Sequence, residues 1–559
     1  MNRISAVFLF FTLIFALIIL RLYYWQIVMR SSLKIEADSQ HFFKFSLPAI
    51  RGEIRTQDMT PLVMNEKVYL VYAEPKNIEN TATFAKAVSE IMTVDLTTLL
   101  TKISDKKTFW VPIKHKVNEE IVSKLKALKI KGLGYARESD RYYPESSMSA
   151  NMLGFVGLDE NGNDKGYFGL EGYYNRELRG KDGSLLQEKD VRGAPILVGE
   201  ITRIEPENGR TLVLYLDRVV QHIIEKKLLD GIEKYGAKEG SVILMDPKTG
   251  GIIASASFPS YNPQNYTDFD KSYYKNSVVG SSYEPGSTIK ALVMAAGIEE
   301  GVVTPDSTMD EQGPVRVGEY AIRTWNNEYH GRITMTQILE RSSNVGMVFV
   351  GEKLGKNKLL KYVHDFGFGE PSGIDLEDES SPELRKSSDW TDIDLATASF
   401  GQGIAVTPLQ MVRAVSAIAN GGKLMEPRVV QSMKDDHGSV YPIQPKVVRK
   451  VISERTAKLV SDMMVLAVDN GEAKWAKPKG YRIAGKTGTA QIPVAGHYDA
   501  TKTIASFVGF APADNPKFVM LVLLSEPTSS QWGSETAAPL FFSIAKELFI
   551  HYDIAPNGY

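Results

Sequence analysis

The 559-residue sequence contains no cysteine. Disulfide bonds, thiolate zinc sites and a cysteine nucleophile are therefore excluded, although this absence does not identify a compartment. An excess of one charge is also missing, because 65 lysine and arginine residues oppose 67 aspartate and glutamate residues. With so little net charge, the composition gives no reason to expect binding to nucleic acid or another polyanion. Internal repeats and low-complexity tracts are absent as well, so partners must be inferred from local features.

Long hydrophobic runs occur only at the amino terminus. The segment Ile4–Leu20 has no charged residue and is long enough to span a membrane. A cleaved signal peptide usually has a shorter apolar core and an A-x-A-like site, and no such site occurs between Leu17 and Ser32. We therefore favour an uncleaved transmembrane anchor over a signal peptide and assign residues 1–30 to it. The rest of the chain is expected to form an ectodomain attached by one helix.

The remaining length is enough for two domains. Residues 31–205 mix short strand-like runs, polar helical runs and glycine-rich turns, which predicts an irregular α+β domain. From residue 206 onward the pattern gives a strand, an amphipathic helix beginning near Asp217, a hairpin around PKTGG, two apolar strands and a closing helix. This order predicts an α+β fold with an antiparallel sheet flanked by helices. Residues 286–475 read as a mostly helical subdomain.

The first candidate for chemistry is Ser287, which follows a Pro-Gly turn at the start of an apolar helix. Lys290 lies three residues later, on the same face of that helix, so its amine can reach the hydroxyl. A serine needs such help to act as a nucleophile. The S-x-x-K pattern alone is weak, because it occurs six times in this sequence. A serine that only caps the helix would look similar.

Two further motifs follow Ser287 in order. Ser342 and Asn344 lie in a break between helical stretches, and Lys486 opens K-T-G-T on a strand-like run. The other K-T-G, at Lys248, reads as a hairpin turn and precedes the serine, so we give it a structural role. A helix start, a loop and a strand that carry S-x-x-K, S-x-N and K-T-G in this order are typical of penicillin-binding proteins and class A β-lactamases.

The sequence resembles the class B penicillin-binding proteins, and within them the division-specific, FtsI-type transpeptidases. The resemblance extends over the whole chain and includes YEPGSTIK, SSNVGM, SFGQGIAVTPLQ, GKTGTAQ and SFVGFAP, with RGEI, RYYP and GLEGYYNRELRG before them. It implies the penicillin-binding transpeptidase fold over residues 206–559, with an antiparallel sheet flanked by helices and an all-helical subdomain. A non-catalytic pedestal of the dimerisation type would occupy residues 31–205. One departure is Arg55-Thr56-Gln57 after RGEI, where the family usually continues with Asp-Arg.

The resemblance also implies roles for the site residues. Ser287 would attack the carbonyl between the two terminal D-alanines of a stem peptide, with Lys290 as general base. Ser342 would relay a proton to the leaving amine, and Asn344 would hold the substrate amide or the lysine. Lys486 would depress the pKa of Lys290 and, together with Thr487, Gly488 and Thr489, bind the terminal carboxylate. Backbone N–H groups of Ser287 and Thr489 would form the oxyanion hole.

No cofactor or metal is implied. The expected partners are the stem pentapeptide donor, an acceptor amine, β-lactams as inhibitors, a polytopic SEDS-type glycosyltransferase and other divisome membrane proteins. Location would be the inner (cytoplasmic) membrane, single-pass, with the catalytic domain on the outer or periplasmic face. Two other functions use the same motifs: a D,D-carboxypeptidase or β-lactamase that transfers the acyl group to water, and a non-catalytic β-lactam sensor or scaffold. The long pedestal disfavours the first, and the short span disfavours the second.

Overall fold

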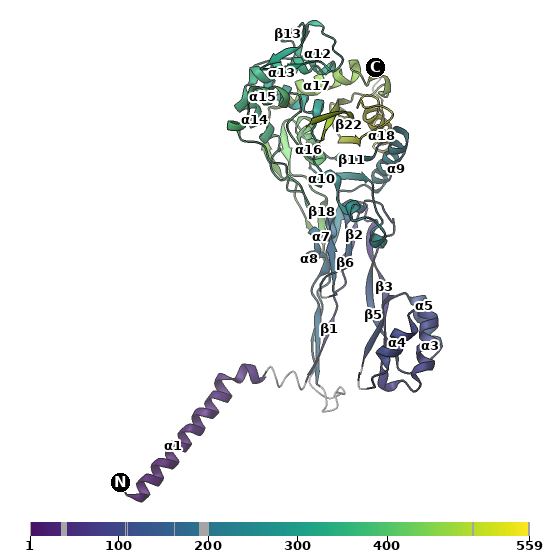
Figure 1. Ribbon diagram of the computed structural model, residues 1–559, viewed down its shortest axis with the longest axis vertical. Helices are drawn as coiled ribbons and strands as arrows, with labels where there is room; N and C mark the ends of the chain where they lie inside the picture. Colours follow the sequence, from purple (N-terminus) through teal and green to yellow (C-terminus); the bar gives the residue numbers. More distant parts are fainter. Residues whose placement is uncertain are drawn as a thin grey trace. The chain divides into compact units, whose positions relative to one another are not determined.

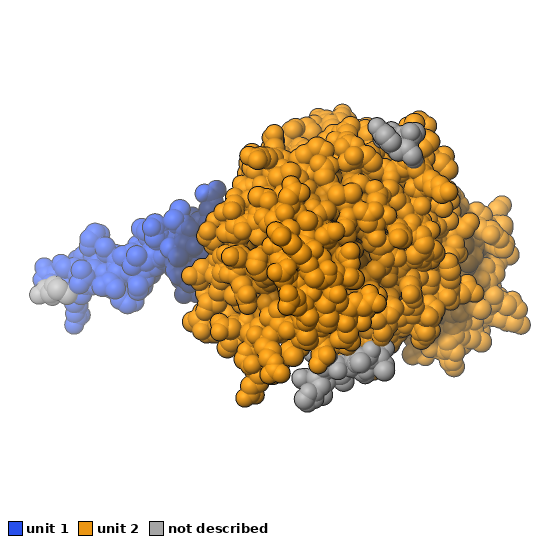
Figure 2. Space-filling model, turned by 90° about the horizontal axis from the view of Figure 1, so that it is seen from above, with its two compact units in different colours: residues 1–51, 179–209 blue, residues 52–178, 210–559 orange. Residues whose placement is uncertain are grey.

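The computed structural model describes residues 2–34, 42–106, 108, 110–160, 162–188, 201–494 and 497–556. The chain forms two compact units, which Figure 2 colours separately. Unit 1 comprises Met1–Arg51 and Arg179–Gly209, and unit 2 comprises Gly52–Leu178 and Arg210–Tyr559. Every residue that the sequence predicts to act in catalysis belongs to unit 2.

Unit 1 holds a long apolar helix and a small sheet. Helix α1 (Arg3–Tyr23) continues through a π-helical turn at Tyr24–Val28, and none of its residues is buried. Within these 26 residues an 18-residue window has a mean hydropathy of 2.6, so length and composition allow the helix to cross a membrane. The antiparallel sheet consists of β1 (Phe42–Leu47), β8 (Gly183–Glu188) and β9 (Ile201–Ile204).

Unit 2 is organised around a five-stranded antiparallel sheet (Figure 1). Its strands, in spatial order, are β12 (Ile252–Phe258), β11 (Glu239–Met245), β23 (Phe518–Ser525), β22 (His497–Ala511) and β21 (Ala484–Val494). Helices α9 (Arg218–Tyr235) and α18 (Ala537–His551) share one hydrophobic cluster with the sheet, and α16 (Pro408–Ala419) shares another. Leu521 belongs to the α16 cluster, whereas its neighbours Met520 and Val522 belong to the α9 and α18 cluster. Since successive strand residues point to opposite faces, helices cover both faces of the sheet.

The elements predicted from apolar periodicity are confirmed in this region. The hairpin around PKTGG is β11 and β12, the two late apolar strands are β22 and β23, and the closing helix is α18. Asp217 caps α9, because its Oδ1 accepts hydrogen bonds from the N–H groups of Val219 (2.9 Å) and Val220 (3.1 Å). The strand that precedes this helix, β10 (Thr211–Leu214), lies in a different sheet.

That second sheet of unit 2 joins segments from both halves of the chain. Its order is β19 (Val440–Pro442), β18 (Val430–Lys434), β10, β2 (Ile54–Arg55), β3 (Pro61–Ala73) and β4 (Val111–Val117), with β5 (Leu133–Tyr142) also paired to β3. Strands β10 and β2 run parallel. Three helices pack on β3 to β5 around a separate apolar core: α3 (Thr81–Met92), α4 (Leu96–Ile103) and α5 (Glu119–Ala127). Shorter elements follow: α6 (Ala150–Leu153), β6 (Phe155–Leu158), β7 (Asp164–Tyr167), α7 (Gly169–Tyr173) and α8 (Asn175–Arg179).

The middle of unit 2 is the predicted helical subdomain. Within residues 286–475 the helices are α11 (Lys290–Glu299), α12 (Met335–Glu340), α13 (Asn344–Leu354), α14 (Lys356–Asp365), α15 (Asp392–Ala398), α16 and α17 (Glu454–Asn470), and the short α10 (Ser277–Gly280) precedes them. This subdomain also carries three small ladders: β13 (Thr308–Glu311) with β16 (Gly331–Thr334), β14 (Val315–Val317) with β15 (Tyr320–Ile322), and β17 (Lys423–Met425) with β20 (Val447–Lys450). Helix α11 is almost entirely buried, so its apolar residues form the centre of this region.

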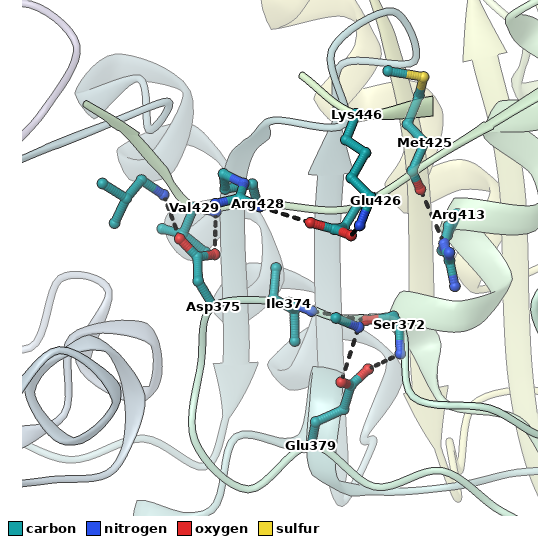
Figure 3. Close-up of polar contacts among 12 residues, drawn as sticks. Ser372, Ile374, Asp375, Glu379, Arg413, Met425, Glu426, Arg428, Val429 and Lys446 are labelled. Carbon is teal, nitrogen blue, oxygen red and sulfur yellow. Dashed lines mark hydrogen bonds and ion pairs between the residues drawn. The ribbon is translucent and has the colours of Figure 1, made fainter. Parts of the chain in front are cut away.

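A buried carboxylate fastens the loop before α15 to the second sheet (Figure 3). Asp375 is 2% exposed and accepts hydrogen bonds from the backbone N–H groups of Val429 (2.6 Å) and Val430 (2.9 Å). The Tyr174 hydroxyl donates a third bond at 2.9 Å. Tyr174 follows α7, in the GLEGYY stretch of the predicted pedestal, so Asp375 connects that segment with the strands that follow α16.

We expect Asp375→Ala to lower the free energy of unfolding by about 3 kcal/mol, because three buried donors lose their acceptor. Differential scanning fluorimetry of the detergent-solubilised chain should show a melting temperature several degrees lower. Asp230→Ala, at an exposed position of α9, is the matched control and should leave the melting temperature unchanged. Equal stability of the two variants would show that the Asp375 contacts contribute nothing net.

Candidate active site

Ser287 lies in a tight turn rather than in the helix that follows it. Gly286–Ile289 form a 3₁₀ turn, and α11 begins at Lys290. Gly286 has φ 53°, a left-handed conformation that glycine adopts without strain, and a Cβ there would lie 2.9 Å from the Thr489 carbonyl oxygen. The Gly286 N–H donates to the Gly401 carbonyl at 3.1 Å. The turn is therefore held between β21 and the SFGQG segment.

Ser342 and Asn344 lie in the short break between α12 and α13. Ser342 has φ 53°, which is uncommon for a residue with a side chain and marks a locally strained backbone. Ser343 stabilises this break, because its Oγ accepts a hydrogen bond from Gly346 N–H at 2.8 Å and donates one to the buried Glu311 carboxylate. Asn344 Nδ2 donates to the Arg323 carbonyl at 3.0 Å.

The K-T-G-T segment lies on β21, the edge strand of the five-stranded sheet. An edge strand leaves backbone groups on its outer side free of strand pairing. Gly488 is needed for close packing, because a Cβ would lie 2.8 Å from Thr288 Cγ2 and 2.4 Å from Ser506 Oγ. The Thr489 hydroxyl accepts a hydrogen bond from Gly533 N–H at 3.0 Å.

Hydrogen bonds connect the three motifs through Ser342. Lys290 Nζ donates to the Ser342 carbonyl (2.6 Å) and to Asn344 Oδ1 (2.7 Å), and it lies 3.3 Å from Ser342 Oγ. On the other side, Lys486 Nζ donates to Ser342 Oγ at 2.9 Å and to Thr487 Oγ1 at 3.2 Å. Both lysines are buried, with exposures of 0% for Lys290 and 3% for Lys486.

Burial changes the protonation of this pair. Desolvation lowers the pKa of Lys290 well below its usual range, and the positive charge of Lys486 lowers it further. Desolvation also lowers the pKa of Lys486, to about 8. Burial and the neighbouring charge of Lys486 therefore both favour the uncharged form of the Lys290 amine. An uncharged amine can accept a proton, and a cation can hold an anionic group.

The site opens into a cleft of about 520 Å³. Five of the eight predicted site residues line it: Ser287, Ser342, Asn344, Thr487 and Thr489. Lys290 and Lys486 lie beneath them, and Gly488 packs against the serine turn. Lys248 of the other K-T-G lies in the β11–β12 hairpin turn, where Asp246 Oδ1 accepts from its N–H at 2.8 Å. Lys248 is not among the residues that line the cleft.

Sequence reasoning did not find several residues of the cleft wall. Trp325 and Trp532 line it and contact each other edge to face, with ring centroids 5.1 Å apart. Glu472, directly after α17, also lines it. Phe400 and Gln402 belong to SFGQG, which carried the family resemblance but had received no role.

Two family models and several known proteins match this chain over most of its length. The model of the penicillin binding protein transpeptidase domain matches residues 240–546, and that of the penicillin-binding protein dimerisation domain matches residues 46–214. Stage V sporulation protein D of Bacillus subtilis is 34% identical over all of this chain and 86% of its own length. Peptidoglycan D,D-transpeptidase FtsI of Escherichia coli K12 is 29% identical over 96% of this chain and 90% of its own.

Solved structures that match this chain are also penicillin-binding proteins. Penicillin-binding protein 2X of Streptococcus thermophilus matches with a TM-score of 0.77 and 25% identity over 92% of this chain and 80% of its own. Penicillin-binding protein 3 of Mycobacterium tuberculosis, complexed with aztreonam, matches with a TM-score of 0.71 and 26% identity over 92% of this chain and 98% of its own. The chain belongs to the penicillin-binding protein transpeptidase family.

The class of protein follows from this membership. The chain is a serine-type acyltransferase with a transpeptidase domain and an amino-terminal dimerisation domain. The family and fold class predicted from the sequence are thereby confirmed. One apolar amino-terminal helix fits a single-pass membrane protein, and penicillin-binding transpeptidases bind peptidoglycan peptides and β-lactams.

Proposed function

We propose that this protein cross-links peptidoglycan as a D,D-transpeptidase, through an acyl-enzyme on Ser287. The observation that carries the proposal is the pair of buried lysines, Lys290 and Lys486, that both hydrogen-bond to Ser342 beside the serine turn. The relatives named peptidoglycan D,D-transpeptidase support the substrate class. The donor is a stem peptide ending in D-alanyl-D-alanine, and the leaving group is D-alanine.

The geometry supports a role for each side chain. An uncharged amine has two N–H bonds and one lone pair. The two short contacts of Lys290, to the Ser342 carbonyl and Asn344 Oδ1, use both N–H bonds. Its lone pair is then free to take the proton of Ser287 as the serine attacks. Ser342 Oγ accepts from Lys486, so its own hydrogen can pass to the leaving amine.

The donor carboxylate and the oxyanion would both bind at the edge of strand β21. Lys486, Thr487 and Thr489 bind the terminal carboxylate by charge and hydroxyl donation, since charge-assisted hydrogen bonds are the stronger ones. Gly488 lets the serine turn approach β21. The N–H groups of Ser287 and Thr489 would hold the oxyanion, and each such donor contributes about 3 kcal/mol to the transition state.

The cellular part of the proposal rests on the family. Residues 1–30 anchor the protein in the inner membrane, residues 31–205 form the pedestal on its outer face, and residues 206–559 form the catalytic domain. A SEDS-type glycosyltransferase in the same membrane would supply the glycan chains for septal synthesis. Since one relative is named for a sporulation stage, depletion separates the roles: filamentous cells support septal synthesis, and rounded or lysing cells contradict it.

The enzymatic proposal is tested with the detergent-solubilised full chain, a stem pentapeptide and an acceptor peptide with a free amine. Mass spectrometry should detect free D-alanine and a cross-linked product in which a D-alanyl carbonyl is joined to the acceptor nitrogen. Release of D-alanine with only the shortened tetrapeptide would indicate a carboxypeptidase. Neither product, in a protein that also binds penicillin, would indicate a non-catalytic sensor or scaffold.

A further inference from the structure

The catalytic cleft carries positive charge. Lys486 lies beneath it beside Lys290, whose uncharged form is favoured by burial, and Arg323 is part of its wall. Glu472 is the one acidic side chain among the described residues that line the cleft. If the proposed function holds, the second half-reaction must bring in an amine, which is an ammonium ion near neutral pH. Because like charges repel, that ammonium needs a local counter-charge before it can approach the acyl-enzyme.

A second cavity, of about 320 Å³, adjoins the cleft. The two cavities share two wall residues, Trp325 and Glu472. The second cavity is also lined by three further glutamates, two basic residues and a second tryptophan: Glu311, Glu328, Glu340, Arg341, Lys474 and Trp475. The junction between the two spaces therefore combines a carboxylate with an aromatic ring, and both groups attract an organic cation.

The Glu472 carboxylate is available for a ligand. It is half-buried, and in the part of the chain that the structure describes it makes no hydrogen bond or ion pair. Its negative charge acts on both lysines, since it opposes the lowering of the pKa of Lys290 and of Lys486. Glu472 therefore lies close enough to the reacting groups to influence them, yet it has no structural partner that would explain its presence.

Contacts around Glu472 and Trp325 restrict both side chains at the junction. Glu472 lies between Gly471 and the buried Ala473, and the Nδ2 of Asn470, two residues earlier, donates to Glu340 Oε1 at 2.7 Å. A Cβ at Gly471 would lie 2.2 Å from the Ala467 carbonyl, so this close exit from α17 requires glycine. Trp325 is fixed on the cleft side by its edge-to-face contact with Trp532.

We propose that Glu472 and Trp325 form the binding site for the ammonium group of the acceptor stem peptide. The acceptor would lie in the second cavity and reach Ser287 through the junction. This inference rests on the proposed function, and it assigns a residue to the half-reaction that the three sequence motifs leave open.

The transfer step follows directly. The bound ammonium loses one proton to water, and the nitrogen lone pair attacks the acyl carbonyl carbon. A C–N bond forms, the ester C–O bond to Ser287 breaks, and the second proton passes from nitrogen through Lys290 to Ser287 Oγ. The products are an amide cross-link and the free serine. Glu472 binds and orients the acceptor and takes no part in the bond exchange.

The test compares two acceptors on the full-length protein with a stem pentapeptide donor. One is a peptide with a lysine-type amine, and the other is hydroxylamine, which is uncharged at neutral pH. Glu472→Gln should raise the acceptor KM for the charged amine at least tenfold and leave hydroxylamine transfer and penicillin acylation within threefold of wild type. Glu472→Asp should restore part of the loss. Glu352→Gln, at an exposed position of α13, is the matched control and should behave as wild type.

Other outcomes would overturn the inference. An equal loss for both acceptors, or an unchanged KM for the charged amine, would remove Glu472 from acceptor binding. A slower hydrolysis with normal aminolysis would make Glu472 a base that activates water. A shifted pH profile of penicillin acylation alone would show that it acts only through the lysines. Failure of the wild-type protein to form any acyl-enzyme would instead refute the proposed function.

Discussion

Lys290→Met is expected to slow acylation of Ser287 by penicillin by about 10²- to 10⁴-fold, the contribution of a positioned general base. Methionine has a similar length and fits an apolar environment, while the replaced amine is fully buried. The variant is therefore expected to fold, and circular dichroism and thermal unfolding are to be measured before the kinetics to check this. The measured quantity is the second-order rate constant of adduct formation with a fluorescent penicillin.

The matched control for this prediction is Lys546→Met. Lys546 completes another S-x-x-K pattern, but it lies exposed on α18. Its loss should leave acylation unchanged. If Lys290→Met acylated at a near-normal rate in a folded protein, another group would have to be the base, and the role proposed for the buried lysine would be wrong.

Lys486→Met is expected to slow acylation at pH 7 by about 10²-fold and to move its pH dependence upward. The charge of Lys486 lowers the pKa of Lys290, so removing that charge raises it. Acylation requires uncharged Lys290, so the rate increases as pH rises through this pKa. In the variant that rise should therefore occur at higher pH. The acylation rate is measured across pH 5 to 10 for both proteins.

The other K-T-G supplies the control for the pH experiment. Lys248→Met removes a lysine from the same tripeptide in a hairpin turn, and its pH profile should match that of wild type. An unchanged profile in Lys486→Met, with only the amplitude reduced, would mean that Lys486 binds the substrate carboxylate without tuning Lys290. A rise that moved to lower pH would contradict the electrostatic argument altogether.

Local signals made much of this structure predictable. The spacing of Ser287 and Lys290, the continuous apolar run of β23 and the capping aspartate of α9 each depend on residues close together in the sequence. For the same reason the three motifs could be assigned to a helix start, a loop and a strand, although Ser287 itself lies in the turn that precedes the helix. The family resemblance then supplied their assembly, which no local pattern contains.

Contacts between distant segments were not predictable from the sequence. Strand β10 pairs with β2 and β18, which are distant from it in the sequence. These strands lie side by side only in the folded unit. The left-handed backbone of Ser342 precedes Ser343, whose hydroxyl donates to Glu311, 32 residues before Ser343 in the sequence. Trp325 and Glu472 belong to no sequence motif. Both line the cleft only because the fold brings their two loops together. Domain boundaries and the roles of the site residues stay predictions.

Mass spectrometry of the full-length protein after reaction with penicillin shows whether Ser287 is the activated nucleophile. One covalent adduct is expected, located on the tryptic peptide that contains Ser287 and absent from Ser287→Ala. An adduct on another residue, or one that persists in Ser287→Ala, would contradict the assignment of the nucleophile. No adduct in a folded wild-type protein would contradict the acylation mechanism itself.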